Sequence, residues 1–403
     1  MRSSPVIVYL SMARIPGRSA HTIQICRTCD ALTSLGARVY LIVPSLSLNL
    51  PRRSDLEAIL SYYGLRCGFH LIRLRMSKIF IKLSEMGGLP SIFVNFLLIV
   101  QFLLLTLALK IAFWGRRFFL YLRGRFIFSS IAMLAPWLLR DVVFEVHNVR
   151  RLMLHGWAGK VKFSAMRRCR VIITIASYLK RILQKLLGVG VNIEVVHDAA
   201  NASLFEKIGL NVDELRRRLR LGDFKVVMYV GSLYSWKKPE FIVDAFKLLR
   251  RNDVVLVFIG GLDEDISRVK SYCEAIGVDR VIFTGFIKPR NVPIYLKLAD
   301  ILVHYTPRGR GFSPLKIFEY MCARKPIVAP NSPGVNEVLR DGVNALLYNP
   351  ESPEDMAYKI KLILDDSELG FKLAEQAYLD AINKYTFKAR AERILKVLNV
   401  YGG

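Results

Sequence analysis

Short apolar runs alternate with amphipathic stretches along most of the chain. A run at residues 5–10 is followed by helical periodicity over 21–35, which ends at Gly36, and by a second run at 38–43. Uninterrupted apolar runs of this length are typical of strands buried on both faces of a parallel sheet. The alternation therefore predicts βαβ units, and it continues with strands at 69–74, 118–122, 142–146, 171–175 and 193–196.

A second series of apolar runs begins after Asn201. Its strands are expected at 226–230, 254–259, 281–284, 301–304 and 327–329, and helices are expected near 353–365, 367–383 and 387–399. A chain of 403 residues is long for a single domain. The pattern predicts an α/β fold of two tandem Rossmann-like domains, 1–200 and 201–385, with a helix over 386–403 packing back towards the first domain.

One uncharged segment, from Met86 to Leu109, interrupts the alternation and is long enough to cross a membrane. A crossing would separate the strands before it from those after it, so one sheet could not form. In a helix, the polar residues of this segment, together with Lys110 just after it, gather on about half of the circumference; those within the segment are Ser91, Asn95, Gln101 and Thr106. We favour a sheet-packing helix over 86–113 whose surplus apolar surface enters a membrane interface, with an ordinary buried helix and a true span as alternatives.

The formal charge of +26 is unevenly distributed. Residues 1–200 hold 28 Lys and Arg against 8 Asp and Glu, whereas residues 201–403 hold 31 against 25. A basic surplus in one half suggests a surface that faces anionic lipid headgroups or nucleic acid, although solubilising charge gives the same count. Because the basic residues lack interleaved aromatic side chains, we expect no nucleic-acid partner and favour a membrane surface.

The six cysteines are scattered, and only Cys26 and Cys29 are close in sequence. They fall in a helical pattern and are read as a core-facing pair, so no metal site or metal cofactor is expected. Unpaired cysteines indicate a reducing compartment. The first eleven residues resemble a strand and not the apolar core of a signal peptide, so we expect a cytoplasmic protein that is peripheral on the cytoplasmic face of the membrane.

Residues 306–330 have the pattern of a flexible turn, a short helix and a buried strand. Ser313 is a good N-cap and Pro314 a good first helical residue, so the helix start would attract phosphate. Lys316 and Glu319 are three residues apart and would share one face, offering a cation for phosphate and a carboxylate for sugar hydroxyls. An ordinary loop, helix and strand connection is the alternative for this segment.

Several short motifs, weak singly, occur in an order and spacing that resembles a known family. They are Met228 to Lys238 with its Val-Gly-Ser-Leu and downstream lysine, Val195 to Asn201 with Phe205, Phe283 to Ile287, Glu319-Tyr320-Met321 and Gly334 to Val338. Together they resemble the retaining, nucleotide-sugar-dependent glycosyltransferases of family 4. The resemblance implies the GT-B fold, in which the parallel sheets of two Rossmann-like domains face across a cleft.

The resemblance also implies site residues. Lys237 would contact the donor diphosphate, Ile287 would lie beside the base, and Glu319 would hold the ribose hydroxyls. Further donor contacts would come from the segments around two glycine turns and the helix start; these are Gly17, Gly231, Ser232, Gly311, Phe312, Ser313, Pro314, Leu315 and Lys316. His147 ends a strand where members of the family contact the transferring sugar, so His147, Lys237 and Glu319 are the expected catalytic residues. His21 is read only as the start of the first helix.

Two positions depart from the family pattern. The first glutamate of the family's paired signature falls on Gly311, and an arginine expected after Gly231 is Ser232. A variant with Ser-Pro-x-Lys and Glu-Tyr-Met has the same pattern, and in it Lys316 would supply the absent charge. We expect a retaining, hexosyl-type transferase that uses a nucleotide diphosphate sugar and a lipid-linked or membrane-associated acceptor. A non-catalytic binder of sugar nucleotides or membranes on the same fold is the alternative.

Overall fold

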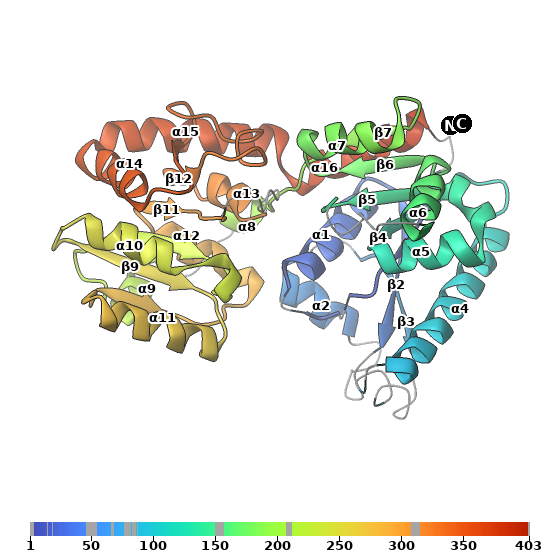
Figure 1. The fold of residues 1–403 in the computed structure, drawn as a ribbon, viewed down its shortest axis with the longest axis horizontal. Coiled ribbons are helices and arrows are strands. Elements are labelled where there is room, and N and C mark those ends of the chain that lie inside the picture. The colour runs from blue at the N-terminus through green and yellow to red at the C-terminus, as the bar shows by residue number, and fades with distance from the viewer. Residues whose placement is uncertain are drawn as a thin grey trace. The chain divides into compact units, whose positions relative to one another are not determined.

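The computed structural model describes residues 4–13, 15–17, 19–45, 55–65, 68–75, 82, 86, 88–149, 157–206, 212–307 and 315–401. The chain divides into two compact units (Figure 1). Unit 1 comprises Met1–His197 and Phe387–Gly403, and unit 2 comprises Asp198–Thr386. Each unit is described by itself.

Within the described residues, unit 1 contains a parallel sheet of seven strands in the order β3-β2-β1-β4-β5-β6-β7. The strands are β1 (Val6–Leu10), β2 (Arg38–Ser45), β3 (His70–Arg75), β4 (Phe118–Arg123), β5 (Val142–Val146), β6 (Val171–Thr174) and β7 (Ile193–Val195). All five residues of β1 are buried, because helices cover both faces of the sheet. The predicted strands of this half are confirmed within two or three residues.

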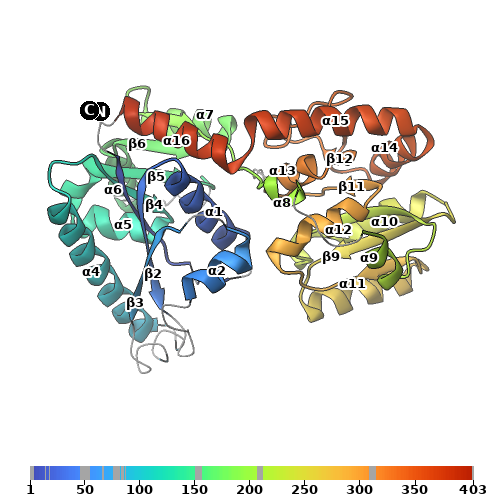
Figure 2. The same ribbon diagram turned by 180° about the vertical axis from the view of Figure 1, so that it is seen from behind.

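Helices α4 (Gly88–Ala112), α5 (Arg125–Leu134), the 3₁₀ helix η1 (Pro136–Asp141), α6 (Trp157–Arg167) and α7 (Ser177–Leu187) pack on the face that carries Val6, Val8 and Leu10. Helices α1 (Ala20–Ser34), α2 (Asp55–Tyr63) and α16 (Phe387–Val400) lie together on the other side (Figure 2). Helix α1 begins because the Ser19 hydroxyl accepts a hydrogen bond from the Thr22 amide at 3.2 Å. Cys26 and Cys29 of α1 are fully buried, as predicted.

Within the described residues of unit 2, six parallel strands run in the order β10-β9-β8-β11-β12-β13. They are β8 (Lys225–Val230), β9 (Val254–Ile259), β10 (Val281–Phe283), β11 (Ile301–Val303), β12 (Ile327–Pro330) and β13 (Leu346–Tyr348). Strand β13, of three residues, was not predicted. The helical elements are α8 (Ser203–Glu206), α9 (Val212–Arg218), η2 (Ser235–Lys237), α10 (Glu240–Leu248), α11 (Asp263–Ala275), η3 (Pro289–Asn291), α12 (Val292–Leu298), α13 (Leu315–Cys322), α14 (Pro353–Asp365) and α15 (Ser367–Lys384).

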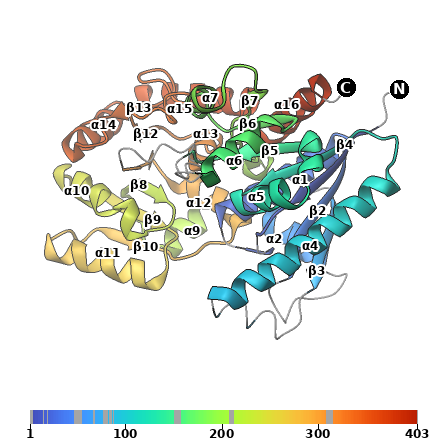
Figure 3. The same cartoon turned by 45° about the vertical axis from the view of Figure 1, so that its right-hand side comes forward.

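Helix α4 lies across one face of the unit 1 sheet (Figure 3). By length and composition its residues Ser91–Ala112 could cross a membrane, with a mean hydropathy of 2.6, and 28% of the most apolar window is buried in the protein. Strands β3 and β4, which α4 connects, belong to the same sheet. A span through α4 is therefore incompatible with this fold, because β3 and β4 would lie on opposite sides of the bilayer.

Candidate functional site

The carboxyl ends of β8 and β9 in unit 2 approach each other closely. A Cβ atom on Gly260, whose φ is 104°, would lie 2.5 Å from the carbonyl oxygen of Gly231. A Cβ on Gly231 would lie 2.6 Å from Oη of Tyr229. A side chain at position 260 would collide with backbone, so glycine is required there, whereas a side chain at position 231 would require the Tyr229 ring to shift. Ligands of open α/β sheets bind at this edge.

Lys237 lies at the end of η2, shortly after Gly231. Its side chain is half-buried, and Nζ lies 5.5 Å from the centre of the Trp236 ring. Burial and then the nearby charge of Lys316 lower the pKa of Lys237 to about 8. Within the described residues Lys237 forms no ion pair with an acidic side chain. An anionic ligand would therefore stabilise its charged form.

Helix α13 supplies Lys316 and Glu319, and Tyr320 fixes its position. The Tyr320 hydroxyl accepts a hydrogen bond from the Val230 amide at 2.8 Å and donates one to the Val303 carbonyl at 3.3 Å. These bonds hold α13 against the ends of β8 and β11. Ile317, Phe318 and Tyr320 are buried, whereas Leu315, Lys316 and Glu319 are half-buried on the remaining face.

His304, directly after β11, lies near the cations Lys237 and Lys316 and completes a cluster of three side chains. Its side chain is buried, and burial followed by the charges of Lys237 and Lys316 lowers its pKa to about 3, so the imidazole is neutral at pH 7. Nε2 lies 2.8 Å from Oγ1 of Thr306, and Nδ1 has no hydrogen-bond partner in the described part of the chain. The sequence interpretation missed His304, although a polar residue ending a parallel strand, the signal used for His147, was present.

The remaining predicted donor residues have different positions. Ser232 is half-buried, and its carbonyl accepts a long hydrogen bond of 3.5 Å from Tyr229 Oη. Ile287 follows β10 at the same edge of the sheet and packs against the apolar core of unit 2. The predictions for Gly311, Phe312, Ser313 and Pro314 lie outside the described residues. Unit 2 thus brings Lys237 and Lys316 together beside Gly231.

His147 and Gly17 lie in unit 1. His147 lines a pocket of about 430 Å³ at the carboxyl end of β5, together with His21, Arg123 and the first turn of α5. Gly17 is held elsewhere by α2, because its amide donates to Tyr63 Oη at 2.6 Å and its carbonyl accepts from the same hydroxyl at 2.9 Å. His21 lines the pocket, whereas the sequence interpretation had read it only as the start of the first helix.

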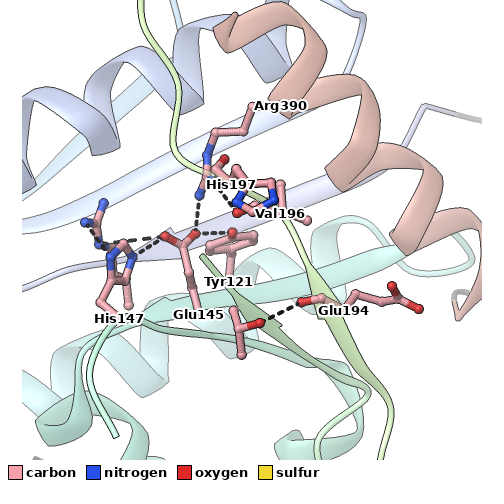
Figure 4. A network of polar contacts seen from close by, with 9 residues as sticks. Tyr121, Glu145, His147, Glu194, Val196, His197 and Arg390 are labelled. Carbon is pink, nitrogen blue, oxygen red and sulfur yellow. Dashed lines mark hydrogen bonds and ion pairs between the residues drawn. The ribbon is translucent and has the colours of Figure 1, made fainter. Parts of the chain in front are cut away.

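A buried network orients His147 (Figure 4). Its Nε2 donates to Oε1 of Glu145, while Nδ1 lies 3.4 Å from Nη2 of Arg123. The other oxygen of Glu145 accepts from Tyr121 Oη and, at 2.8 Å, from Nη2 of Arg390. Because Nε2 is bound to Glu145, His147 could contact a sugar through a ring nitrogen only if Nδ1 gave up its contact with Arg123.

The charge of Glu145 is fully compensated. Burial alone would raise its pKa, but Arg390, His147 and Arg123 outweigh burial and hold the pKa well below the ordinary value. Arg390 lies on α16 and also donates to the carbonyls of Val196 at 2.9 Å and His197 at 2.5 Å. The network joins the C-terminal helix to the edge of the unit 1 sheet, so it positions the pocket wall.

The two lysines at this edge of unit 2 can attract an anion, and this property is compatible with the comparison to known families. Residues 211–380 match the family model of glycosyl transferases group 1. The match lies within unit 2. The chain is 30% identical over 191 residues to an alpha-D-kanosaminyltransferase of Streptomyces kanamyceticus, covering 47% of this chain and 49% of that protein.

A GDP-mannose-dependent alpha-(1-6)-phosphatidylinositol monomannoside mannosyltransferase of Mycobacterium tuberculosis is 25% identical over 226 residues, covering 53% of this chain and 58% of that protein. The chain thus spans about half the length of the curated relatives it matches. The structure superimposes on Anabaena Alr3699/HepE in complex with UDP and glucose with a TM-score of 0.72 and 17% identity, over 98% of this chain and 99% of that one. The predicted two-domain α/β fold of the GT-B type is confirmed.

Proposed function

We propose that this protein is a glycosyltransferase that moves a sugar from a nucleotide diphosphate sugar to an acceptor. The observation that carries the proposal is the cationic cluster of Lys237, Lys316 and neutral His304 at the carboxyl edge of the unit 2 sheet. This cluster lies in the part of the chain that matches the family model of glycosyl transferases group 1. Relatives named as sugar transferases support the same reaction class.

In this proposal the cluster binds the donor diphosphate. Lys237 and Lys316 offset the negative charge that grows on the leaving nucleoside diphosphate, which lowers the energy of the transition state. In this proposal a phosphate approaches the backbone at Gly231, at the carboxyl edge of the unit 2 sheet where ligands of open α/β sheets bind. His304 contributes hydrogen-bonding capacity and no third positive charge, because it is neutral at pH 7.

The half-buried face of α13 gives Glu319 a separate role. Its carboxylate would accept hydrogen bonds from the ribose hydroxyls, and Ile287 would contact the base. Retention at the anomeric carbon and a hexosyl donor are proposed from the family resemblance alone. No metal cofactor is proposed, since the two lysines can supply the positive charge that the diphosphate requires.

The proposed acceptor is lipid-linked or membrane-associated, with the protein peripheral on the cytoplasmic face of the membrane. The surplus of basic residues in positions 1–200 and the strongly apolar helix α4 support this acceptor class. One relative is named for transfer to a phosphatidylinositol mannoside. His147 and His21 in the unit 1 pocket are the residues we propose to face the acceptor side of the reaction.

A screen of nucleotide diphosphate sugars by thermal shift tests the donor, because a ligand that binds the folded state raises the apparent melting temperature. We expect at least one donor to stabilise the protein and to be consumed when membrane lipids are supplied, with an unchanged anomeric configuration by NMR. Binding without consumption over a broad acceptor panel would favour the non-catalytic alternative, which the substitutions at Gly311 and Ser232 motivate. Absence of binding by every donor would contradict the proposal.

A further inference from the structure

The outward face of α4 is apolar. Its exposed large apolar side chains are Leu89, Ile92, Phe93, Phe96, Leu104 and Ile111, which are 49–80% exposed. A surface helix of a water-soluble domain usually turns its polar face to solvent. A row of exposed large apolar side chains marks a surface that contacts something other than water.

Most of the polar residues of α4 lie towards the protein. Thr106 is fully buried and donates its hydroxyl to the Phe102 carbonyl at 2.7 Å, and Lys110 pairs with Asp141 at the end of η1. Asn95 donates to Ser91 at 3.5 Å, and both are half-buried. The four polar groups are therefore satisfied within unit 1, and the outward face is left to apolar residues and Gln101.

Two exposed tryptophans lie at the C-terminal end of this face. Trp114, just after α4, is 84% exposed, and Trp137 of η1, beside the last turn of α4, is 59% exposed. Indole rings are enriched at the boundary between lipid and water, where they contact both. We call the six outward apolar residues of α4 together with Trp114 and Trp137 the α4 surface.

Exposed arginines lie near the same end of α4. Arg116 follows α4, Arg140 lies in η1, and Arg168 donates Nη2 to the Pro136 carbonyl at 3.4 Å, next to Trp137. A second copy of the chain on this surface would bring these like charges together across a symmetric interface. Anionic lipid headgroups complement them instead.

The inward face of α4 determines how it can meet a bilayer. Val94, Leu98 and Phe102 are buried, and Leu98 and Phe102 pack in the core that includes strands β1 and β4. Because that face is committed to the sheet, only the outward face is available to lipid. The helix must then lie in the plane of the interface, where an apolar face enters the boundary between headgroups and acyl chains.

We propose that the α4 surface docks unit 1 on an anionic lipid bilayer, with α4 parallel to the membrane. The proposal rests on the proposed function in that a membrane acceptor gives docking its purpose. Helix α5 packs against α4, and its first turn, with Phe126 and Ile127, lines the unit 1 pocket. Docking would therefore bring the pocket that holds His147 close to a lipid-linked acceptor.

A vesicle flotation assay tests the docking. One set of vesicles contains phosphatidylcholine alone, and the other contains about 30 mol% phosphatidylglycerol as the anionic lipid. We expect the full chain to float with anionic vesicles at low salt. The variant Leu104→Glu/Ile111→Glu changes only exposed positions and should lower the partition coefficient at least about tenfold, since charge at the apolar face opposes insertion. Phe371→Glu on α15, also at an exposed apolar position (64%), is the matched control and should float like wild type.

The variant Arg116→Glu/Arg140→Glu tests the electrostatic contribution. Its partition coefficient on anionic vesicles should fall about fivefold or more per substituted residue, and its partition coefficient on neutral vesicles should change little. Wild type that stays unbound, or α4 variants that float equally, would overturn the proposal. A lipid-independent dimer in solution that Leu104→Glu/Ile111→Glu dissociates would assign the surface to a second copy and also overturn it. Donor binding, measured by thermal shift on the same proteins, should be the same in the variants as in wild type. If wild type binds no donor, the proposed function is contradicted, whereas the result of the flotation assay still decides the docking proposal.

Discussion

The protein has one cluster of charged side chains at the carboxyl ends of the strands in each unit, and the two clusters differ in how their charges are balanced. In unit 1, Glu145 is compensated by Arg390, His147 and Arg123, and its pKa is held well below the ordinary value. In unit 2, like charges gather, and the pKa values of Lys237 and His304 are lowered to about 8 and about 3. A compensated cluster stabilises the fold, whereas a cluster of like charges is stabilised by a ligand of opposite charge.

The largest expected effect is on the stability of unit 1. Glu145→Ala leaves Arg390 and Arg123 buried without their carboxylate, so the free energy of unfolding should fall by about 3–5 kcal/mol. Urea denaturation measures it. Glu392→Ala, on the same helix as Arg390, removes only an exposed pair with Lys388 and should cost less than about 0.5 kcal/mol. Equal costs for the two variants would contradict the structural role of the network.

The variant Lys237→Ala should lose activity and keep its stability, unlike Glu145→Ala. Donor-dependent transfer should fall about a hundredfold in kcat/KM, because a cation at the leaving diphosphate is lost. Stability should be unchanged or slightly higher, because repulsion with Lys316 is relieved. Lys247→Ala, an exposed lysine of α10, is the control. Wild-type transfer by Lys237→Ala would remove the lysine from the donor site.

Acid should weaken unit 2 through His304. The folded-state pKa is about 3 and lies below the ordinary value of 6.5, so the neutral imidazole is favoured in the folded protein. Its contribution to stability is present above pH 6.5 and is lost as the pH falls from there towards 3. Between pH 7 and pH 5 the wild type should lose about 2 kcal/mol more than His304→Gln. Parallel pH dependences for the two proteins would refute the burial of a neutral His304.

The pH profile of catalysis should report Lys237. The kcat/KM for the donor describes the free enzyme, so it should decline about tenfold per unit as the pH rises above about 8, where Lys237 loses its proton. Lys237→Arg should remain flat through this range, because arginine stays protonated. A decline that persists in the arginine variant would assign the titration to another group.

Sequence reasoning located most of the sheets because their strands are uninterrupted apolar runs. It missed β13, whose three residues are too few to show a period. It found the apolar character of α4 and could not tell which face the sheet covers, since Lys110 pairs with Asp141, which only the fold brings near. The Glu145 network could not be predicted from the sequence, because Arg390 lies 245 residues away from Glu145 in the chain.

The candidate site residues show a similar division. Lys237, Lys316 and Glu319 were accessible from local motifs, because a strand, a turn and a helix start lie within one short segment each. His304 carries the same strand-end signal as His147, yet its burial and its proximity to both lysines depend on how β11 packs against η2 and α13. Tertiary packing therefore decides which polar strand-end residue faces a cluster of charges.

Calorimetry of nucleoside diphosphate binding at pH 8, in buffers of different ionisation enthalpy, tests the central claim most directly. If the diphosphate contacts Lys237, binding raises the lysine pKa from about 8, and wild type should take up about 0.5 proton per nucleotide. Lys237→Arg should bind with no uptake, because its guanidinium is already charged. Binding by wild type without proton uptake, or equal uptake by Lys237→Arg, would contradict the assignment of the unit 2 cluster as the donor diphosphate site.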